Sequence, residues 1–167
     1  DDPLYGDDGD DFLIPGTGND DVEGGPGVDL IYYGDNPGAM YVDLAQGVAT
    51  DTTGKIDELT GIEAVWGSSF ADTIRGNAAA NRLLGQNGDD LLEGGGGADV
   101  FVYTSITDSA GAAGRDTIGD FNRAEGDRID LTRIDADPDV AGVQAFRFLG
   151  NQAFDGAAGA LTVQVLT

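Results

Sequence analysis

An acidic or amide side chain, usually aspartate, recurs every nine residues along two stretches of the chain, and an apolar residue follows it by two positions. A fixed period of this length is typical of a solenoid, in which each repeat forms one unit and neighbouring units stack. Each unit has a turn of six residues, often glycine-rich, and a strand of three, so two units make a coil of 18 residues. Units two apart in sequence therefore stack at the spacing of strands in a sheet, which brings their acids together. The recurring positions are Asp2, Asp11, Asp20 and Asp29 in the first stretch and Glu63, Asp72, Asn81, Asp90, Asp99 and Asp108 in the second.

The charge of the chain is strongly unbalanced. It has 31 acidic residues against 8 basic ones, which gives a formal net charge of −23, and 26 of the acids are Asp. Aspartate favours turns over helices, so we expect these acids in loops. Such a charge keeps a chain disordered unless it is neutralised, yet 40% of the residues are hydrophobic and regularly spaced. The composition favours a chain that folds once a hard cation with oxygen ligands binds its acids.

The residue types that are missing exclude several classes of protein. The chain has no His and no Cys, so it has no imidazole base, no thiolate nucleophile, none of the usual zinc ligands except acids, and no disulfide. It offers no basic surface to nucleic acid or to an anionic membrane. No apolar stretch reaches the roughly 18 residues of a membrane-spanning helix. We therefore expect no enzyme, no nucleic-acid partner and no transmembrane segment.

Several units match the pattern GGxGxDxUx, in which U is a large apolar residue. Because glycine permits positive φ and close approach of the backbone, such turns let consecutive carbonyl groups converge on one point. The chain resembles the RTX proteins, which carry this hemolysin-type calcium-binding repeat. The clearest units are GDDGDDFLI at 6–14, PGTGNDDVE at 15–23, GGPGVDLIY at 24–32, GQNGDDLLE at 85–93 and GGGGADVFV at 94–102.

The tail of the chain carries a second resemblance. The runs ADVFVY at 98–103, DTIGDF at 116–121 and GDRIDL at 126–131 are similar to the C-terminal region of serralysin-type secreted metalloproteases, which caps the open end of a roll. The two resemblances imply an all-β fold, a right-handed parallel β-roll or β-solenoid of nonapeptide repeats with a C-terminal capping segment. They divide one continuous β-roll domain into a first repeat block at 1–32, an irregular insertion at 33–57 where the solenoid continues without metal, a second block at 58–111 and a cap at 112–167.

The resemblance also implies several Ca²⁺ ions and a set of ligands. In RTX proteins each ion is held by the carbonyls of positions 2 and 4 and the carboxylate of position 6 in one unit. The unit two later adds the carbonyls of positions 1 and 3 and its own position 6 carboxylate. Carried over, these positions are Asp7, Gly9 and Asp11 with Gly24, Pro26 and Asp29; Ser68, Phe70 and Asp72 with Gly85, Asn87 and Asp90; and Asn77, Ala79 and Asn81 with Gly94, Gly96 and Asp99.

Other implied sites depart from the pattern. Asp20, with Gly16 and Gly18, lacks a regular unit two later, where Asp35 is the usable carboxylate. Asn81 is neutral, so we expect a weaker or empty site there. A further site combines Gln86, Gly88 and Asp90 with Asp108 of the next unit and with Asp116 of the Asp116-Thr117-Ile118 step.

These features predict a calcium-binding module of a secreted, extracellular bacterial protein. Low cytosolic calcium would leave the module unfolded for export through a type I secretion channel, and calcium outside the cell would fold it and stabilise its parent. Serralysin-type proteases hold zinc with an HExxHxxGxxH motif in a separate domain, and because this chain has no His, their peptidase activity does not carry over.

The alternative is a calcium-dependent module that binds an extracellular polysaccharide or a cell surface. The aromatic residues that could stack on sugars are Trp66, Tyr32, Tyr33 and Tyr41. A third hypothesis, a polysaccharide lyase, would need a base beside the ions, and Arg82 is the candidate. An outward ladder of Trp66, Leu84 and Val102 is expected to be covered by the tail.

Overall fold

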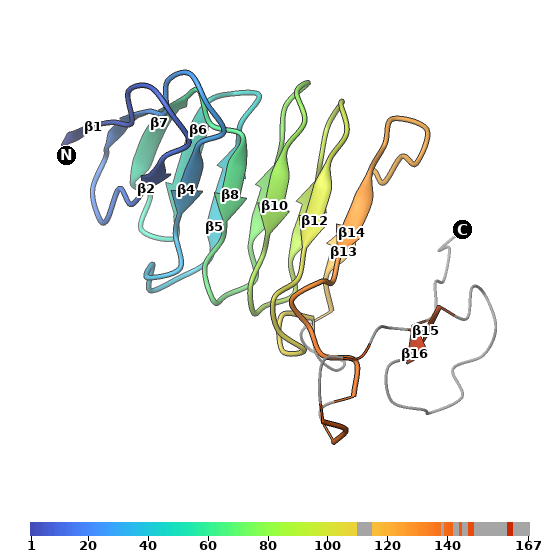
Figure 1. Cartoon of the computed structure of the whole chain (residues 1–167). Coiled ribbons are helices and arrows are strands. Elements are labelled where there is room, and N and C mark those ends of the chain that lie inside the picture. Colours follow the sequence, from blue (N-terminus) through green and yellow to red (C-terminus); the bar gives the residue numbers. More distant parts are fainter. Residues whose placement is uncertain (110–114, 138, 142–143, 145–146, 149–159, 162–167) are drawn as a thin grey trace. The chain divides into compact units, whose positions relative to one another are not determined.

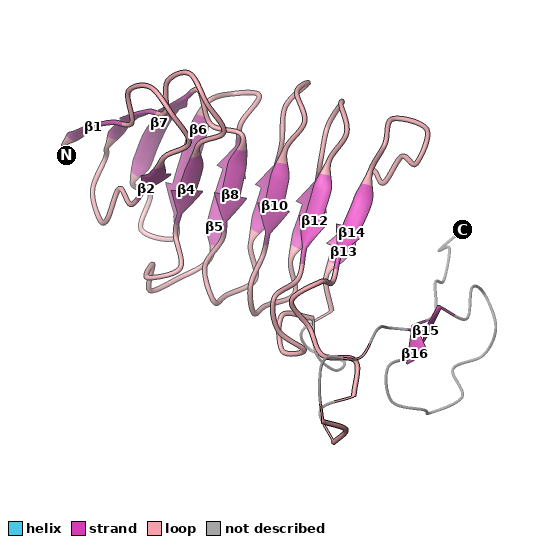
Figure 2. Ribbon diagram, viewed as in Figure 1, coloured by secondary structure: helices cyan, strands magenta, loops and turns pink. Residues whose placement is uncertain are grey.

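The computed structural model describes residues 1–109, 115–137, 139–141, 144, 147–148 and 160–161. All of the regular structure in these residues is β-strand (Figure 2). A search of the same residues finds no helix long and apolar enough to cross a membrane. The chain divides into two compact units, Asp1–Leu131 and Thr132–Thr167.

The first unit is a stack of coils whose strands alternate between two sheets (Figure 1). Strands one coil apart pair in parallel, so Leu83 lies opposite both Val65 and Phe101. This spacing confirms the coil of two units predicted from the period. Sheet A, in spatial order, contains β1 (Pro3–Tyr5), β3 (Asp21–Glu23), β7 (Ile56–Thr60), β6 (Val48–Asp51), β5 (Met40–Asp43), β9 (Thr73–Arg75), β11 (Leu91–Glu93) and β13 (Thr117–Ile118). Sheet B contains β14 (Arg128–Asp130), β12 (Val100–Val102), β10 (Arg82–Leu84), β8 (Ala64–Trp66), β4 (Leu30–Tyr32) and β2 (Phe12–Leu13).

The core of this unit is a column of apolar side chains between the two sheets. Successive residues of a strand point to opposite faces, and the central residue of each short strand points inward. These inward side chains are completely buried, whereas the glycine-rich turns on either side of them are not. The core is therefore limited to one narrow column. Its fully buried members are Val22, Ile31, Val42, Val65, Ile74, Leu83, Leu92 and Phe101.

Residues 33–57 do not form a regular coil but begin an antiparallel meander, β5–β6–β7. β5 pairs in parallel with β9 and β7 with β3, so the meander continues sheet A, while β4 pairs directly with β8 in sheet B. The alternating apolar residues Met40 and Val42 lie in β5, the apolar patch from Ile56 to Leu59 lies in β7, and β6 lies between these two strands. Positive φ angles at Gly47 (67°) and Gly54 (82°) permit the two tight turns.

The coil stacking extends into the region expected to cap the roll. β13 pairs with β11 and β14 with β12, both in parallel. In the second unit, β15 (Arg147–Phe148) pairs in parallel with β16 (Ala160–Leu161). Much of the expected cap, including 112–114 and 149–159, lies outside the described residues. On the outer face of sheet B, Leu84 and Val102 are each only 2% exposed, whereas Trp66 stays half-buried.

Candidate metal centre

The recurring acids form two ladders, one along each edge of the coil stack. In each step, a carboxylate oxygen accepts a hydrogen bond from the backbone N–H of the equivalent residue in the neighbouring coil. Along the edge that leads into sheet B, Asp11 donates to Asp29 (2.9 Å), Asp29 to Glu63 (3.1 Å), Asn81 to Asp99 (2.8 Å) and Asp99 to Asp127 (3.0 Å). Along the edge that leads into sheet A, Asp2 donates to Asp20 (2.8 Å), Asp20 to Asp57 (3.0 Å), Asp72 to Asp90 (2.8 Å) and Asp90 to Asp116 (3.2 Å).

The second oxygen of many of these carboxylates has no partner. Six Oδ2 atoms are buried and accept no hydrogen bond within the chain. Leaving a buried carboxylate oxygen unpaired is costly, because the protein replaces none of the water that it loses. Such an atom therefore indicates a ligand that the polypeptide does not itself supply. The six belong to Asp11, Asp20, Asp29, Asp90, Asp99 and Asp116.

Two neighbouring pairs carry a free oxygen on both members. Asp11 and Asp29 are consecutive steps of one ladder, and Asp90 and Asp116 are consecutive steps of the other. The first pair is the one that the repeat pattern matches best. In the second pair, Asp116 occupies the place expected from its Asp-x-Ile step.

Backbone carbonyl groups face the same inter-coil space. A side chain at Gly25 would collide with the carbonyl oxygen of Asp7, and one at Gly27 with that of Gly9. The carbonyls at positions 2 and 4 of one turn therefore point at the turn stacked on it, as the expected ligand set requires. The same relation joins Gly88 to the Phe70 carbonyl, Gly95 to the Asn77 carbonyl and Gly97 to the Ala79 carbonyl.

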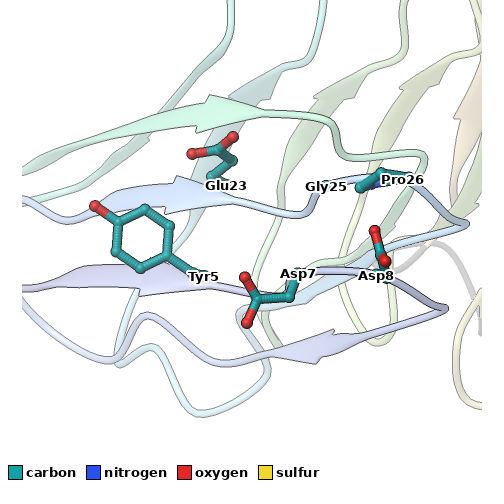
Figure 3. A pocket seen from close by; sticks show the side chains of 6 residues that line it. All are labelled: Tyr5, Asp7, Asp8, Glu23, Gly25 and Pro26. Atoms are coloured by element: carbon teal, nitrogen blue, oxygen red, sulfur yellow. The ribbon is translucent and has the colours of Figure 1, made fainter.

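Acidic side chains also gather around the first pair of turns. Figure 3 shows Asp7 and Asp8 on one turn and Gly25 and Pro26 on the turn beside it. Residues 1–32 contain no Lys or Arg, so no basic side chain of this segment offsets these acids. The residues that line this open pocket are Tyr5, Asp7, Asp8, Glu23, Gly25 and Pro26.

Two of the expected ligands are already satisfied by hydrogen bonds within the protein, Asp72 in its own turn and Asn81 both in its own turn and to the neighbouring coil. The Asp72 carboxylate accepts bonds from the Ser68 N–H (2.6 Å) and from the Ser68 hydroxyl (2.7 Å). The Asn81 side chain accepts from the Asn77 N–H (2.8 Å) and donates to the Glu63 carbonyl (3.2 Å). These turns thus leave no unpaired side-chain oxygen at position 6, although the residues lie in the predicted register.

Asp108 takes a different place from the other recurring acids. Its carboxylate accepts bonds from the Thr104 N–H (2.7 Å) and the Ser105 N–H (2.9 Å), so it closes a local turn. The N–H of Asp90 instead donates to Asp116. Of the two acids expected beside Asp90, the structure hydrogen-bonds Asp116 to it.

Sequence reasoning missed two members of the ladders, Asp57 and Asp127. Asp57, rather than Asp35, accepts the bond from the Asp20 N–H, and Asp127 accepts the bond from the Asp99 N–H. Both lie outside recognisable nonapeptides. A signal was present nonetheless, because each acid precedes an apolar residue by two positions, Leu59 or Ile129.

The donor set fits a hard cation better than a transition metal. The described residues contain no group of three or more acidic side chains arranged to hold a metal ion. An ion between two turns would therefore take two carboxylates and draw its other ligands from backbone carbonyls. An all-oxygen set of this kind suits Ca²⁺, which accepts six to eight flexible oxygen ligands.

Burial raises the pKa of three of these carboxylates, those of Asp90, Asp99 and Asp116. The pKa of Asp90 rises to about 7, mainly because the group is buried and further because Asp116 and Asp72 are close. The pKa of Asp116 rises to about 6, again mainly through burial, with a contribution from Asp108. Burial likewise raises the pKa of Asp99. Without a cation, the folded chain therefore holds protons that an unfolded chain releases.

Comparison with known proteins gives one family. The family described as peptidase M10 serralysin C terminal matches residues 4–164, which covers nearly the whole chain. No curated protein matches the sequence.

The raised pKa values predict how the metal-free fold responds to pH. Because the folded-state pKa of Asp90 lies above its unfolded value of about 3.9, stability is lost as pH rises from about 4 through about 7. In EDTA, the folded fraction of the coil stack, followed by circular dichroism, should be lower at about pH 7.5 than at about pH 5. Asp90→Asn should reduce this pH dependence, whereas Asp8→Asn, at an exposed position, should change it less. A folded fraction that rises between about pH 5 and about pH 7.5 would contradict a raised pKa at Asp90.

Proposed function

The chain belongs to the peptidase M10 serralysin C-terminal family, and we propose that it is the calcium-binding RTX module of a secreted bacterial protein. In this proposal the module folds when calcium binds outside the cell, and it supports the type I secretion and the stability of its parent. It has no catalytic role of its own. The expected setting is extracellular, with calcium ions and, in transit, the type I secretion channel as partners.

The observation that carries this proposal is the set of six buried carboxylate oxygens without partners. When both acids of a neighbouring pair are charged, they repel each other across the two coils. A bound Ca²⁺ supplies the positive charge that these oxygens lack. Of the six acids, only Asp20 has a cationic group of the described residues within 4.0 Å, the amino group of Asp1 at 3.6 Å.

The proposed ligands follow from the geometry of the two complete pairs. Asp11 and Asp29 would hold one ion with the carbonyls of Asp7, Gly9, Gly24 and Pro26. Asp90 and Asp116 would hold another with the carbonyls of Gln86 and Gly88. The Pro26 carbonyl also accepts a hydrogen bond from the Gly9 N–H (3.0 Å), so the two turns are held in contact by the backbone itself.

If calcium binding and folding are coupled, the module stays unfolded at the low calcium concentration of the cytosol and folds only after export. Extracellular calcium modules bind with dissociation constants of about 10⁻⁴ to 10⁻³ M, far above the levels that cytosolic sensors detect. The paired carboxylates of one ion are 18 residues apart in the first site and 26 in the second, so each site exists only in the folded coil. Metal binding and folding are then one event.

Removal of calcium should therefore unfold most of the coil stack. Circular dichroism and calorimetry at about pH 7.5 should show a β-rich, cooperatively melting protein in millimolar calcium. In EDTA, much of this signal and the high-temperature transition should be lost. Magnesium at the same concentration should restore little, because it prefers a rigid octahedral set with several waters. An identical melting curve in calcium and in EDTA would contradict the proposed function.

A matched pair of variants separates ligand loss from charge loss. Asp29→Asn removes a free oxygen of the first pair, and Asp8→Asn removes an equal charge from an exposed position. Asp29→Asn should raise the calcium concentration at the folding midpoint about tenfold or more, because calcium affinity depends on the charge of the ligands. Asp8→Asn should shift it far less. Calcium titration followed by circular dichroism measures both, and equal shifts would speak against Asp29 as a ligand.

A second candidate function, calcium-dependent binding of carbohydrate or a cell surface, is favoured by an aromatic row on sheet B. Phe12, Tyr32 and Trp66 have ring centroids 5.5 to 6.2 Å apart, and Phe12 is 54% exposed. The other two aromatic candidates are less available, because Tyr33 is buried and Tyr41 packs beneath Arg75. The net charge of −23 disfavours polyanionic glycans, so the fitting ligand is a neutral one.

Trp66 is the single tryptophan of the chain and reports directly on this row. Addition of neutral oligosaccharides, such as cello-oligosaccharides and chito-oligosaccharides, should shift its emission in calcium but not in EDTA. Phe12→Ala should weaken that response by about threefold or more while leaving the calcium-induced circular dichroism unchanged. An emission that no tested oligosaccharide alters would remove this second candidate.

A further inference from the structure

We infer that calcium holds only the two ends of the coil stack, and that the middle segment, residues 33–84, stays folded without it. This inference rests on the proposed function, since it concerns which turns need the ion. It goes beyond the expectation that the insertion lacks metal, because it includes two turns of the second repeat block. It also assigns to the middle segment a role as a preformed template for the ends.

The first observation is where the unpartnered oxygens lie. Three belong to acids before residue 33, and three belong to acids after residue 84. The structure describes every residue from 33 to 84, and none of the unpartnered buried side-chain atoms falls in this segment. The ends therefore lack a partner for their acids, whereas the middle segment does not.

The second observation is how the middle turns close. In the turn before β9, Ser68 is completely buried and donates both its N–H and its hydroxyl to Asp72. In the turn before β10, the amide of Asn81 does what a carboxylate cannot, because it both accepts from Asn77 and donates to the Glu63 carbonyl. Side-chain and backbone donors thus occupy the position that a cation would take.

The third observation is a neutral donor beside Asp57, another ladder acid of the middle segment. The hydroxyl of Tyr33 donates to Asp57 Oδ2 (2.9 Å), while the other oxygen of Asp57 accepts the Asp20 N–H. Tyr33 and Asp57 are 2% and 6% exposed. This acid is consequently satisfied on both oxygens, unlike Asp20 beside it.

The fourth observation is that the middle segment has its own core and little charge. The antiparallel meander adds Met40, Val42, Leu44, Ala49 and Leu59 to the buried apolar column. Residues 33–84 carry seven acids and three basic residues, whereas residues 1–32 carry ten acids and no basic residue. Residues 85–131 carry ten acids and three basic residues. The repulsion between acidic side chains, which calcium would offset, is therefore concentrated in residues 1–32 and 85–131.

Hydrogen exchange of the full chain, read by mass spectrometry in calcium and in EDTA, tests the inference. In calcium, amides of all strands from β1 to β14 should be protected. In EDTA, protection should persist in β5 to β10 and be lost in β1 to β4 and β11 to β14. Loss of protection everywhere in EDTA would overturn the inference while leaving calcium-driven folding intact. Protection retained everywhere in EDTA would overturn both it and the proposed function.

Two variants test the closing contacts themselves. Ser68→Ala leaves Asp72 without its hydroxyl donor, and Asn81→Asp puts a carboxylate where an amide donates to Glu63. Each should raise the exchange rate of the adjoining strand in EDTA about tenfold or more. Ser69→Ala, the same change at the exposed neighbouring serine, should leave exchange unchanged. Each variant is compared in calcium and in EDTA, because a general folding defect would raise exchange in both. Exchange rates in EDTA equal to those of Ser69→Ala would overturn the role given to these contacts.

Discussion

The stacking of the coils depends on carboxylates that have a hydrogen-bond partner on one oxygen and none on the other. One oxygen of a recurring aspartate accepts the N–H of the equivalent residue one coil away, which fixes the register of the stack. In five of these acids, Asp20, Asp29, Asp90, Asp99 and Asp116, the other oxygen is buried without a partner. The same group thus holds neighbouring coils together and, while it is charged, destabilises the fold that it aligns. A cation placed between coils would convert this second effect into attraction.

This arrangement links composition to the proposed function. The apolar core is a single column of side chains, so burial alone gives each short repeat little stability. The strand pairing is regular, but its turns carry most of the charge of the chain. A protein built in this way is sensitive to the calcium concentration around it. Within the same stack, Ser68, Asn81 and Tyr33 show that ordinary donors can satisfy the same position.

The nine-residue period predicted the register of the coils, the inward apolar residues and most members of the two ladders, because these follow from strand geometry alone. It could not reveal Asp57 and Asp127, since their segments keep the acid-to-apolar spacing and lose the glycine pattern. Nor could it separate free carboxylates from satisfied ones. Asp72 and Asp90 occupy the same repeat position, but Asp72 accepts hydrogen bonds from Ser68 in its own turn and from the N–H of Met40 in the meander.

The most direct measurement is anomalous diffraction from crystals of the full chain grown in calcium. The account predicts ions between Asp11 and Asp29 and between Asp90 and Asp116, each about 2.3–2.6 Å from the Oδ2 atoms that the structure leaves unpaired. It predicts no ion between Asn81 and Asp99 as well bound as these two. Folded coils whose Oδ2 atoms bind no ion, or accept hydrogen bonds only from water, would contradict the central claim.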